Sequence, residues 1–124
     1  MKTLYTVQHT QSEHHVNGMV GSWTDCDLTE KGIEQADRIS RRLQKELAGK
    51  EAVLFASDLK QAKHTAEPIA NRLPIVPVLK TELRERSLGK CFGKSVQWLK
   101  ENLECDERTI DDRLFSDPES WRDV

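Results

Sequence analysis

Short apolar runs typical of strands alternate along this chain with longer stretches whose apolar residues have helical spacing. The apolar runs cover residues 4–7, 52–56 and 75–79, and the helical spacing of three and four covers residues 33–47 and 59–73. Strands that alternate with helices predict parallel βαβ units with right-handed crossovers. The sequence therefore predicts an α/β fold, in which ligands bind at the carboxyl ends of the strands.

Individual residues mark the expected ends of these elements. Thr29 is the expected N-cap of the first long helix, and Gly49 lies where that helix should stop. Pro68 is expected to kink the second long helix, and Pro77 suits a strand at the edge of the sheet. A further short helix is predicted over residues 96–103.

Chemically active side chains follow each of the three expected strands. His9 follows the first, residues 57–61 follow the second at the start of a helix, and Glu85 follows the third. Phosphoryl transfer through a phosphohistidine needs a nucleophilic imidazole, an anion-binding helix end and an acid that protonates the leaving group. We therefore interpret His9 as the catalytic nucleophile and Glu85 as the catalytic acid.

Four segments carry a resemblance to a known family, in the family's order and near its spacing. They are Gln8-His9-Thr10, Trp23 to Ala36, Ser57 to Glu67 and Leu83 to Gly93. The chain resembles the N-terminal part of the histidine phosphatase superfamily, the phosphoglycerate-mutase-like proteins. The resemblance implies a Rossmann-like three-layer α/β/α fold, a phosphate-accepting histidine at His9 and a proton donor at Glu85.

The same resemblance defines the expected domain organisation. The family has a second pocket histidine late in its domain, and this chain ends at Val124 without a counterpart. We therefore expect one partial, C-terminally truncated domain over residues 1–124. Its motif-bearing part covers residues 1–103, and an acidic tail covers residues 104–124.

Two positions of the expected phosphate pocket depart from the family's pattern. Gln8 and Gln61 stand where the family has its two phosphate-binding arginines. Hydrogen bonds to charged groups contribute roughly 1.5–3 kcal/mol each, so these two replacements together weaken transition-state stabilisation by about 3–6 kcal/mol. The sequence therefore predicts weakened catalysis.

Neighbouring side chains are expected to complete this pocket. Lys60 adds positive charge beside Gln61 without the bidentate grip of an arginine. Ser12 either contacts the phosphate or caps a turn. His15 stands where the mutases carry an asparagine and donates to phosphate when protonated, near its reference pKa of about 6.5. This predicts an acidic optimum for any residual activity.

These residues favour a phosphomonoester hydrolase that acts through a phosphohistidine, with a mutase less favoured. The alternative is a catalytically inactive member that binds a phosphorylated ligand or a protein, or a non-functional truncated fragment. No cofactor is implied. Adjacent His14 and His15 with distant Cys26 lack a recognised metal-ligand spacing, so no metal site is expected.

Charge and composition fit a small anionic ligand. Residues 101–124 carry nine acidic and three basic side chains, which leaves a net charge of +4 for residues 1–100 of a chain whose total is −2. This excess is too small for a nucleic-acid partner. No signal peptide or membrane segment is expected, and three cysteines without a Cys-x-x-Cys pair favour reduced thiols and a cytoplasmic location. The substrate and the oligomeric state stay open.

Overall fold

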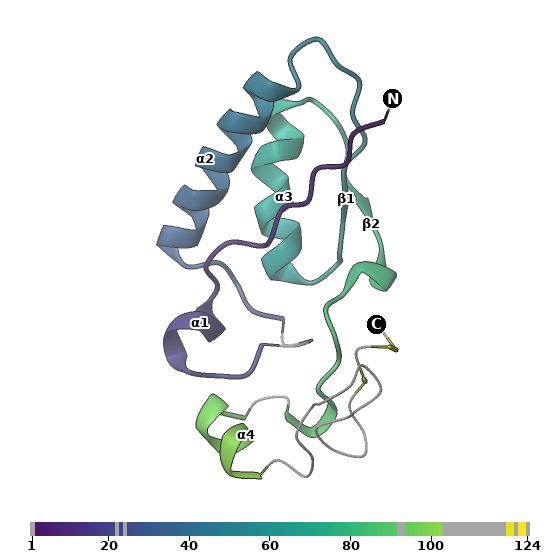
Figure 1. Ribbon diagram of the computed structural model, residues 1–124. Helices are drawn as coiled ribbons and strands as arrows, with labels where there is room; N and C mark the ends of the chain where they lie inside the picture. Colours follow the sequence, from purple (N-terminus) through teal and green to yellow (C-terminus); the bar gives the residue numbers. More distant parts are fainter. Residues whose placement is uncertain are drawn as a thin grey trace.

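A computed structural model describes residues 2–21, 23, 25–91, 94–102, 119–120 and 122–123. Its elements, in chain order, are α1 (Glu13–Asn17), α2 (Glu30–Glu46), β1 (Phe55–Ala56), α3 (Lys60–Arg72), β2 (Val78–Leu79) and α4 (Val96–Asn102), with 3₁₀ turns at Thr81–Leu83 and Gly89–Cys91. Helices α2 and α3 lie side by side, and α3 also contacts β1 (Figure 1). The chain thus has the α/β class that its sequence predicts.

The two strands form a parallel pair joined by a helix. Phe55 lies opposite Val78 and Ala56 opposite Leu79. Backbone hydrogen bonds of 2.8 Å run from the Val78 N–H to the Leu54 carbonyl and from the Lys80 N–H to the Ala56 carbonyl. Because α3 connects β1 to β2, this part of the chain is the βαβ unit that the alternating pattern predicts.

Helix α2 begins where the sequence predicts. The Thr29 hydroxyl accepts a hydrogen bond of 3.1 Å from the Gly32 N–H, which confirms Thr29 as the N-cap. Ala36 and Ser40 are buried on the face toward α3. From α3, Arg72 donates to the Ser40 hydroxyl at 2.7 Å and to the Asp37 carboxylate at 2.9 Å. A small apolar contact and the hydrogen bonds donated by Arg72 therefore hold the two helices together.

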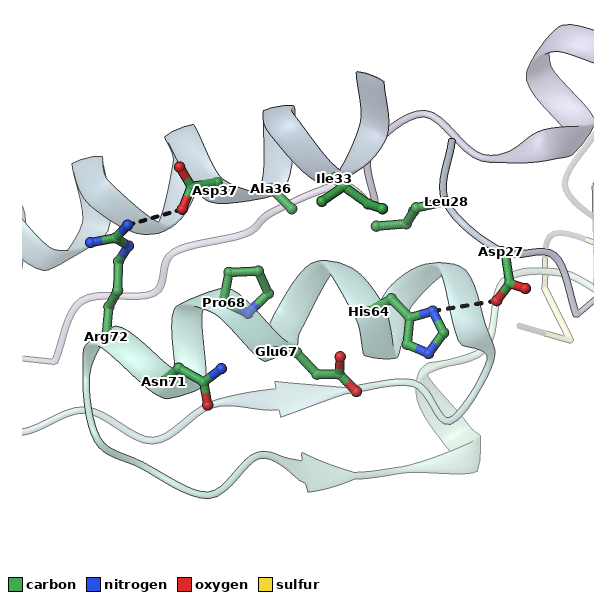
Figure 2. Close-up of a pocket in the computed structure, with 10 residues that line it drawn as sticks. All are labelled: Asp27, Leu28, Ile33, Ala36, Asp37, His64, Glu67, Pro68, Asn71 and Arg72. Carbon is green, nitrogen blue, oxygen red and sulfur yellow. Dashed lines mark hydrogen bonds and ion pairs between the residues drawn. The ribbon is translucent and has the colours of Figure 1, made fainter. Parts of the chain in front are cut away.

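A groove of about 740 Å³ lies between α2 and α3 on the side shown in Figure 2. Pro68 is one of the residues that line it, inside a helix that continues as one element from Lys60 to Arg72. At one end of the groove Arg72 meets Asp37, and at the other end His64 lies 3.5 Å from Asp27 (Figure 2). Polar contacts between side chains thus connect the two walls of the groove at both of its ends.

A second, smaller apolar cluster lies near α4. Val20 and Cys91 are buried there, and Leu88, Trp98 and Leu99 pack against them. Cys26 and Cys91 are both buried, and neither is part of a disulfide bond. Cys105 lies outside the described residues.

The strands differ from the sequence-based expectation. Residues 4–7 are extended but form no strand, and Leu4 is 86% exposed, so the prediction of a buried strand there is wrong. The other two strands are shorter than the runs of residues 52–56 and 75–79 that predicted them. An apolar run gives strand propensity, but a strand forms only where a neighbour accepts and donates its backbone hydrogen bonds. No ladder bonds involve residues 4–7 within the described part of the chain.

The predictions for the C-terminal part of the chain fall mostly outside the described residues. Helix α4 ends at Asn102, and residue 103 of the predicted helix lies outside the described residues. Of the predicted acidic tail, only residues 119–120 and 122–123 are described. Among the described helices, none is both long enough and apolar enough to pass through a membrane.

Candidate functional site

His9 lies at the end of the extended N-terminal segment, half-buried, with one ring nitrogen held. Its Nδ1 lies 2.9 Å from the Thr10 carbonyl oxygen. Because a carbonyl oxygen only accepts hydrogen bonds, Nδ1 carries the proton of the neutral ring and Nε2 keeps its lone pair. His9 therefore presents one nucleophilic nitrogen in a fixed orientation.

Thr10, the residue after His9, is hydrogen-bonded to both long helices. Its N–H donates to the Thr65 hydroxyl at 3.1 Å, and its own hydroxyl donates to the Gly32 carbonyl at 2.7 Å. The Thr65 hydroxyl in turn donates to the Gln61 carbonyl at 2.7 Å. Thr10 and Thr65 are both buried, so these bonds are shielded from water. The position of His9 thus depends on the packing of α2 and α3.

Gly32 allows the loop after His9 to approach α2 closely. A Cβ atom at this position would lie 2.0 Å from the Gln11 carbonyl oxygen, which is well inside van der Waals contact. The same loop is fixed by hydrogen bonds of 3.0 Å from the Thr29 N–H to the Gln11 carbonyl and from the Glu13 N–H to the Asp27 carbonyl. Only glycine fits at position 32 without a shift of this loop.

One cavity of about 890 Å³ brings four of the predicted site residues together. Its wall is formed by the N-terminal segment, the β1 region, the first half of α3 and residues near the end of β2. The predicted site residues in this wall are Gln8, His9, Gln61 and Glu85. The predicted nucleophile, the predicted acid and the two glutamines of the predicted phosphate pocket therefore line a common cavity.

Gln61 and Glu85 are neighbours in the cavity wall. Gln61 is 1% exposed, and its Nε2 donates to a Glu85 carboxylate oxygen at 3.4 Å. The Glu85 side chain stays exposed to solvent overall, but partial loss of water at the wall raises its pKa, against the smaller opposing effects of His9 and Gln61. Glu85 therefore keeps its proton to a higher pH than an ordinary glutamate, which suits a general acid.

The arginine before Glu85 has a structural partner. Arg84 donates two hydrogen bonds of 2.6 Å to the Asp58 carboxylate, and its guanidinium lies 5.0 Å from the centre of the Trp23 ring. The Trp23 indole N–H donates to the Glu85 carbonyl. The Arg84 guanidinium also holds the pKa of Asp58 below its ordinary value. These contacts fix the backbone that carries Glu85.

Ser12 is fully buried and holds two histidines of α1. Its N–H donates to His15 Nδ1 at 3.1 Å, and its hydroxyl lies 2.7 Å from His14 Nδ1. The His15 ring stacks against the His9 ring, with centroids 5.3 Å apart. Ser12 and His15 therefore lie beside the nucleophile, although neither belongs to the wall of the cavity.

The expected charge on these histidines is not present near neutral pH. Burial, with the neighbouring His15 and His9, lowers the pKa of His14 to about 4. Burial and His9 also lower the pKa of His15. The pKa of both rings therefore lies below the reference value expected from the sequence, because burial disfavours the charged form and the neighbouring imidazoles also oppose it.

The positive charge of the cavity comes from a residue that the sequence did not indicate. Lys60 is exposed and lies outside the cavity wall, and its backbone N–H donates to the Asp25 carboxylate at 2.7 Å. Among the described residues of the wall, Lys80 is the one lysine or arginine, against the carboxylates of Glu82 and Glu85. Lys80 directly follows β2, so its position at a strand's carboxyl end was the available signal.

Similarities to known proteins agree with this architecture. A sequence model of the histidine phosphatase superfamily (branch 1) matches residues 4–124. A 2,3-bisphosphoglycerate-dependent phosphoglycerate mutase of Beijerinckia indica subsp. indica is 38% identical over 96 residues, which cover 74% of this chain and 45% of the mutase.

Solved structures of other proteins have a similar fold. Mycobacterial hydrolase 1 aligns with a TM-score of 0.81 at 25% identity, over 93% of this chain and 55% of the hydrolase. A mycobacterial glucosyl-3-phosphoglycerate phosphatase in complex with VO3 aligns with a TM-score of 0.68 at 28% identity, over 75% of this chain and 43% of the phosphatase.

The chain spans about half the length of the curated relatives that it matches. The family match nevertheless covers nearly all of the chain, including His9, Gln61 and Glu85. The βαβ unit, the histidine at the end of the N-terminal segment and the family match lead to one conclusion: the chain belongs to the histidine phosphatase superfamily, branch 1.

Proposed function

We propose that this chain is a phosphomonoester hydrolase of the histidine phosphatase type that acts through a phosphohistidine. His9 Nε2 attacks phosphorus, the bond between phosphorus and the ester oxygen breaks, and Glu85 gives its proton to the leaving alkoxide. Water then attacks the phosphohistidine, the Glu85 carboxylate takes a proton from that water, and the N–P bond breaks to release inorganic phosphate. A mutase is less favoured.

One observation carries this proposal: His9, whose Nδ1 is held by a backbone carbonyl, and Glu85, whose pKa is raised, line the same cavity. The Thr10 carbonyl holds the His9 proton on Nδ1, so that Nε2 is available for attack. The raised pKa of Glu85 keeps this carboxyl protonated over a wider range of pH. A nucleophile and an acid with different environments are what two-step phosphoryl transfer requires.

The substrate class proposed is a small phosphorylated molecule. A cavity of about 890 Å³ has room for such a ligand. The similar proteins include a phosphoglycerate mutase and a glucosyl-3-phosphoglycerate phosphatase, whose names both specify phosphoesters. The proposed pocket residues beside His9 and Glu85 are Gln8 and Gln61 in the cavity wall, with Ser12, His15 and Lys60 as weaker proposed contacts because these three lie outside the wall.

Weakened activity follows from the charge of the cavity wall. Gln8 and Gln61 are neutral, and Lys80 faces two carboxylates among the described lining residues. Phosphoryl transfer spreads negative charge over three oxygens, and fixed cations stabilise that charge. A wall without arginine therefore supports phosphate binding more readily than rapid turnover.

The test is a thermal melt with vanadate, in the presence of a metal chelator. Vanadate resembles the five-coordinate phosphoryl transition state, and a ligand that binds only the folded state raises the melting temperature. We expect the melting temperature to rise with vanadate concentration in the wild type and in His64→Ala, a control in the separate groove of Figure 2, but not in His9→Ala. A phosphoryl group trapped on His9 after incubation with a phosphomonoester would establish the intermediate.

A second candidate function is phosphate-ligand binding without turnover. The neutral side chains of Gln8 and Gln61 favour it, because binding tolerates their weaker hydrogen bonds better than catalysis does. This candidate predicts a vanadate-dependent melt that requires His9, with no phosphohistidine formed from any phosphomonoester. The two candidate functions thus predict different results in the trapping experiment: a phosphohistidine for the hydrolase and none for the binding protein.

A further inference from the structure

Three imidazoles converge beside the candidate site, and no hydrogen bond between the rings explains their convergence. His9, His14 and His15 each offer one ring nitrogen, and these nitrogens all lie within 4.8 Å of one another. The ring centroids of His14 and His15 are 4.1 Å apart, and that of His9 is 5.7 Å and 5.3 Å from them. We propose that these three residues together bind one divalent transition-metal ion of the zinc class.

The separations suit such an ion after a small movement. Three imidazole nitrogens about 2.0–2.1 Å from a tetrahedral zinc ion lie about 3.4 Å from one another. The nitrogens in this cluster must therefore approach by about 1.4 Å or less, since they begin within 4.8 Å. His14 and His15 lie on the five-residue helix α1, and His15 is exposed, so rotation of these side chains can close the site.

Partners on the far side of the rings resemble those of metal-binding histidines. A ligating histidine usually bonds a carbonyl, a carboxylate or another polar group through its second nitrogen, which orients the first. His9 Nδ1 bonds the Thr10 carbonyl, and His14 Nδ1 bonds the Ser12 hydroxyl. His15 Nδ1 accepts from the Ser12 N–H, so His15 exchanges this bond or reorients its ring when it ligates.

The ligand type of the cluster also decides which ions it can bind. Neutral imidazole is the form that binds transition metals, and imidazole sites favour zinc, copper and nickel over magnesium and calcium. Glu13 is the acidic residue of α1, adjacent to His14 in the chain.

The site would leave at least one coordination position open. Three protein ligands with an open fourth position take water or an anionic ligand. The ion would use His9, so a metal-loaded chain could not form the phosphohistidine through the same nitrogen. This consequence for phosphoryl transfer rests on the proposed function, whereas metal binding itself does not.

The experiment is a calorimetric titration of the untagged, chelator-stripped chain with Zn²⁺ alone, followed by Co²⁺ and Mg²⁺. We expect one Zn²⁺ per chain, a visible absorption band typical of tetrahedral Co²⁺, and no measurable binding of Mg²⁺. His14→Ala and His15→Ala should each raise the Kd for Zn²⁺ about tenfold to a hundredfold or more. The matched control His64→Ala should leave the Kd unchanged, because His64 lies with Asp27 in the separate groove.

A variant that keeps the three histidines tests the geometry. A Cβ atom at Gly21 would lie 2.8 Å from His14 Nε2, so Gly21→Ala should displace this ring and weaken Zn²⁺ binding. Circular dichroism verifies that each variant folds. If His14→Ala does not fold, His14→Gln replaces it. The proposal is overturned if the wild type binds no Zn²⁺, if the His14 and His15 variants keep its affinity, or if His64→Ala loses as much.

The two proposals fail separately. Zinc binding is measured without phosphate or vanadate, and the vanadate melt is measured with a chelator. A chain that responds to vanadate but not to Zn²⁺ overturns the metal site alone. A chain that binds Zn²⁺ through these histidines but ignores vanadate overturns the proposed function alone.

Discussion

Single side chains decide how far this site can stabilise a phosphoryl group. Gln8 and Gln61 both line the cavity with His9, but they differ in exposure: Gln8 is exposed, and Gln61 is 1% exposed beside Glu85. An arginine at position 8 would keep its charge in contact with water, whereas one at position 61 would be buried. Position 8 is therefore the better place to restore a cation.

We predict that Gln8→Arg raises phosphomonoesterase activity. One hydrogen bond to a charged group contributes roughly 1.5–3 kcal/mol, so kcat/KM should increase about tenfold to a hundredfold. Steady-state kinetics with a generic aryl phosphate provide the measurement. Gln8→Met is the matched control, since it has similar size without charge. Equal activity of the arginine and methionine variants would contradict the proposed role of position 8.

We predict that His14 makes stability depend on pH between about 6.5 and about 4. The pKa of His14 falls from 6.5 to about 4 on folding, so the unfolded chain binds the extra proton first. Stability from this residue is therefore complete above pH 6.5 and is lost as pH falls toward 4. Urea denaturation at a series of pH values measures it, and His14→Gln should show a shallower decline over this window. An identical decline in both chains would refute the assignment.

The helices position the site through contacts that are lost when one hydroxyl group is removed or one methyl group is added. Thr65 of α3 receives the Thr10 N–H and donates to the Gln61 carbonyl, so one hydroxyl connects the loop after His9 to the helix that carries Gln61. Gly32 of α2 leaves room for the Gln11 carbonyl on the other side of this loop. Both positions therefore support the backbone next to His9, and Thr65 also lines the cavity.

We predict that Thr65→Val destabilises the chain by about 1–3 kcal/mol, because it leaves the buried Thr10 N–H without an acceptor. Chemical denaturation measures the loss. Thr65→Ser keeps the hydroxyl and should retain most of the stability and the vanadate response. The prediction fails if the serine variant is as unstable as the valine variant.

We predict that Gly32→Ala costs roughly 1–3 kcal/mol and weakens the vanadate response, because the new methyl group displaces the Gln11 backbone next to His9. Gly49→Ala is the control. A Cβ at Gly49 meets nothing within 4 Å, but its φ of +73° strains any other residue. The control should therefore lose stability while its vanadate response persists. Parallel loss of the response in both variants would mean that stability alone governs it.

At the scale of the whole molecule, local signals predicted more than long-range ones. Helix α2 was predictable because Thr29 caps it and its apolar residues repeat along one face. The strand expected at residues 4–7 was not, because a strand depends on a neighbour that its own sequence does not specify. The shared cavity of His9 and Glu85 was predicted from the rule that parallel strands end at one edge, although residues 4–7 before His9 form no strand in the structure.

Other features of the site could not be predicted because they depend on three-dimensional packing. The pKa of His14 and of His15 is lowered by burial and by crowding against His9, which both arise from the position of α1 beside the N-terminal segment. The place of Lys80 in the cavity wall likewise follows from the pairing of β2 with β1. Neither is visible in residue spacing.

Exposed apolar side chains predict self-association of the whole molecule. Leu4 and Val76 are each 86% exposed, Val53 is 72% exposed, and Phe55 on β1 is 56% exposed. We predict a sedimentation coefficient that increases with protein concentration and a smaller increase in Val76→Lys. Ile33→Lys, which alters an exposed residue of α2 in the groove, should associate like the wild type. Purely monomeric behaviour at all concentrations would contradict this prediction.

The buried hydrogen bonds of Thr10 also link ligand affinity to helix docking. Because the Thr10 N–H is bonded to Thr65 of α3, local opening that exposes this amide to deuterium must separate the loop from α3, and the Thr10 hydroxyl holds the same residue to α2. Any ligand held by His9 should then slow amide exchange in α2 and α3, and substitutions that tighten these helices should by reciprocity increase the affinity of His9 for its ligand. Substitutions distant from the cavity thus become a means to adjust its occupancy.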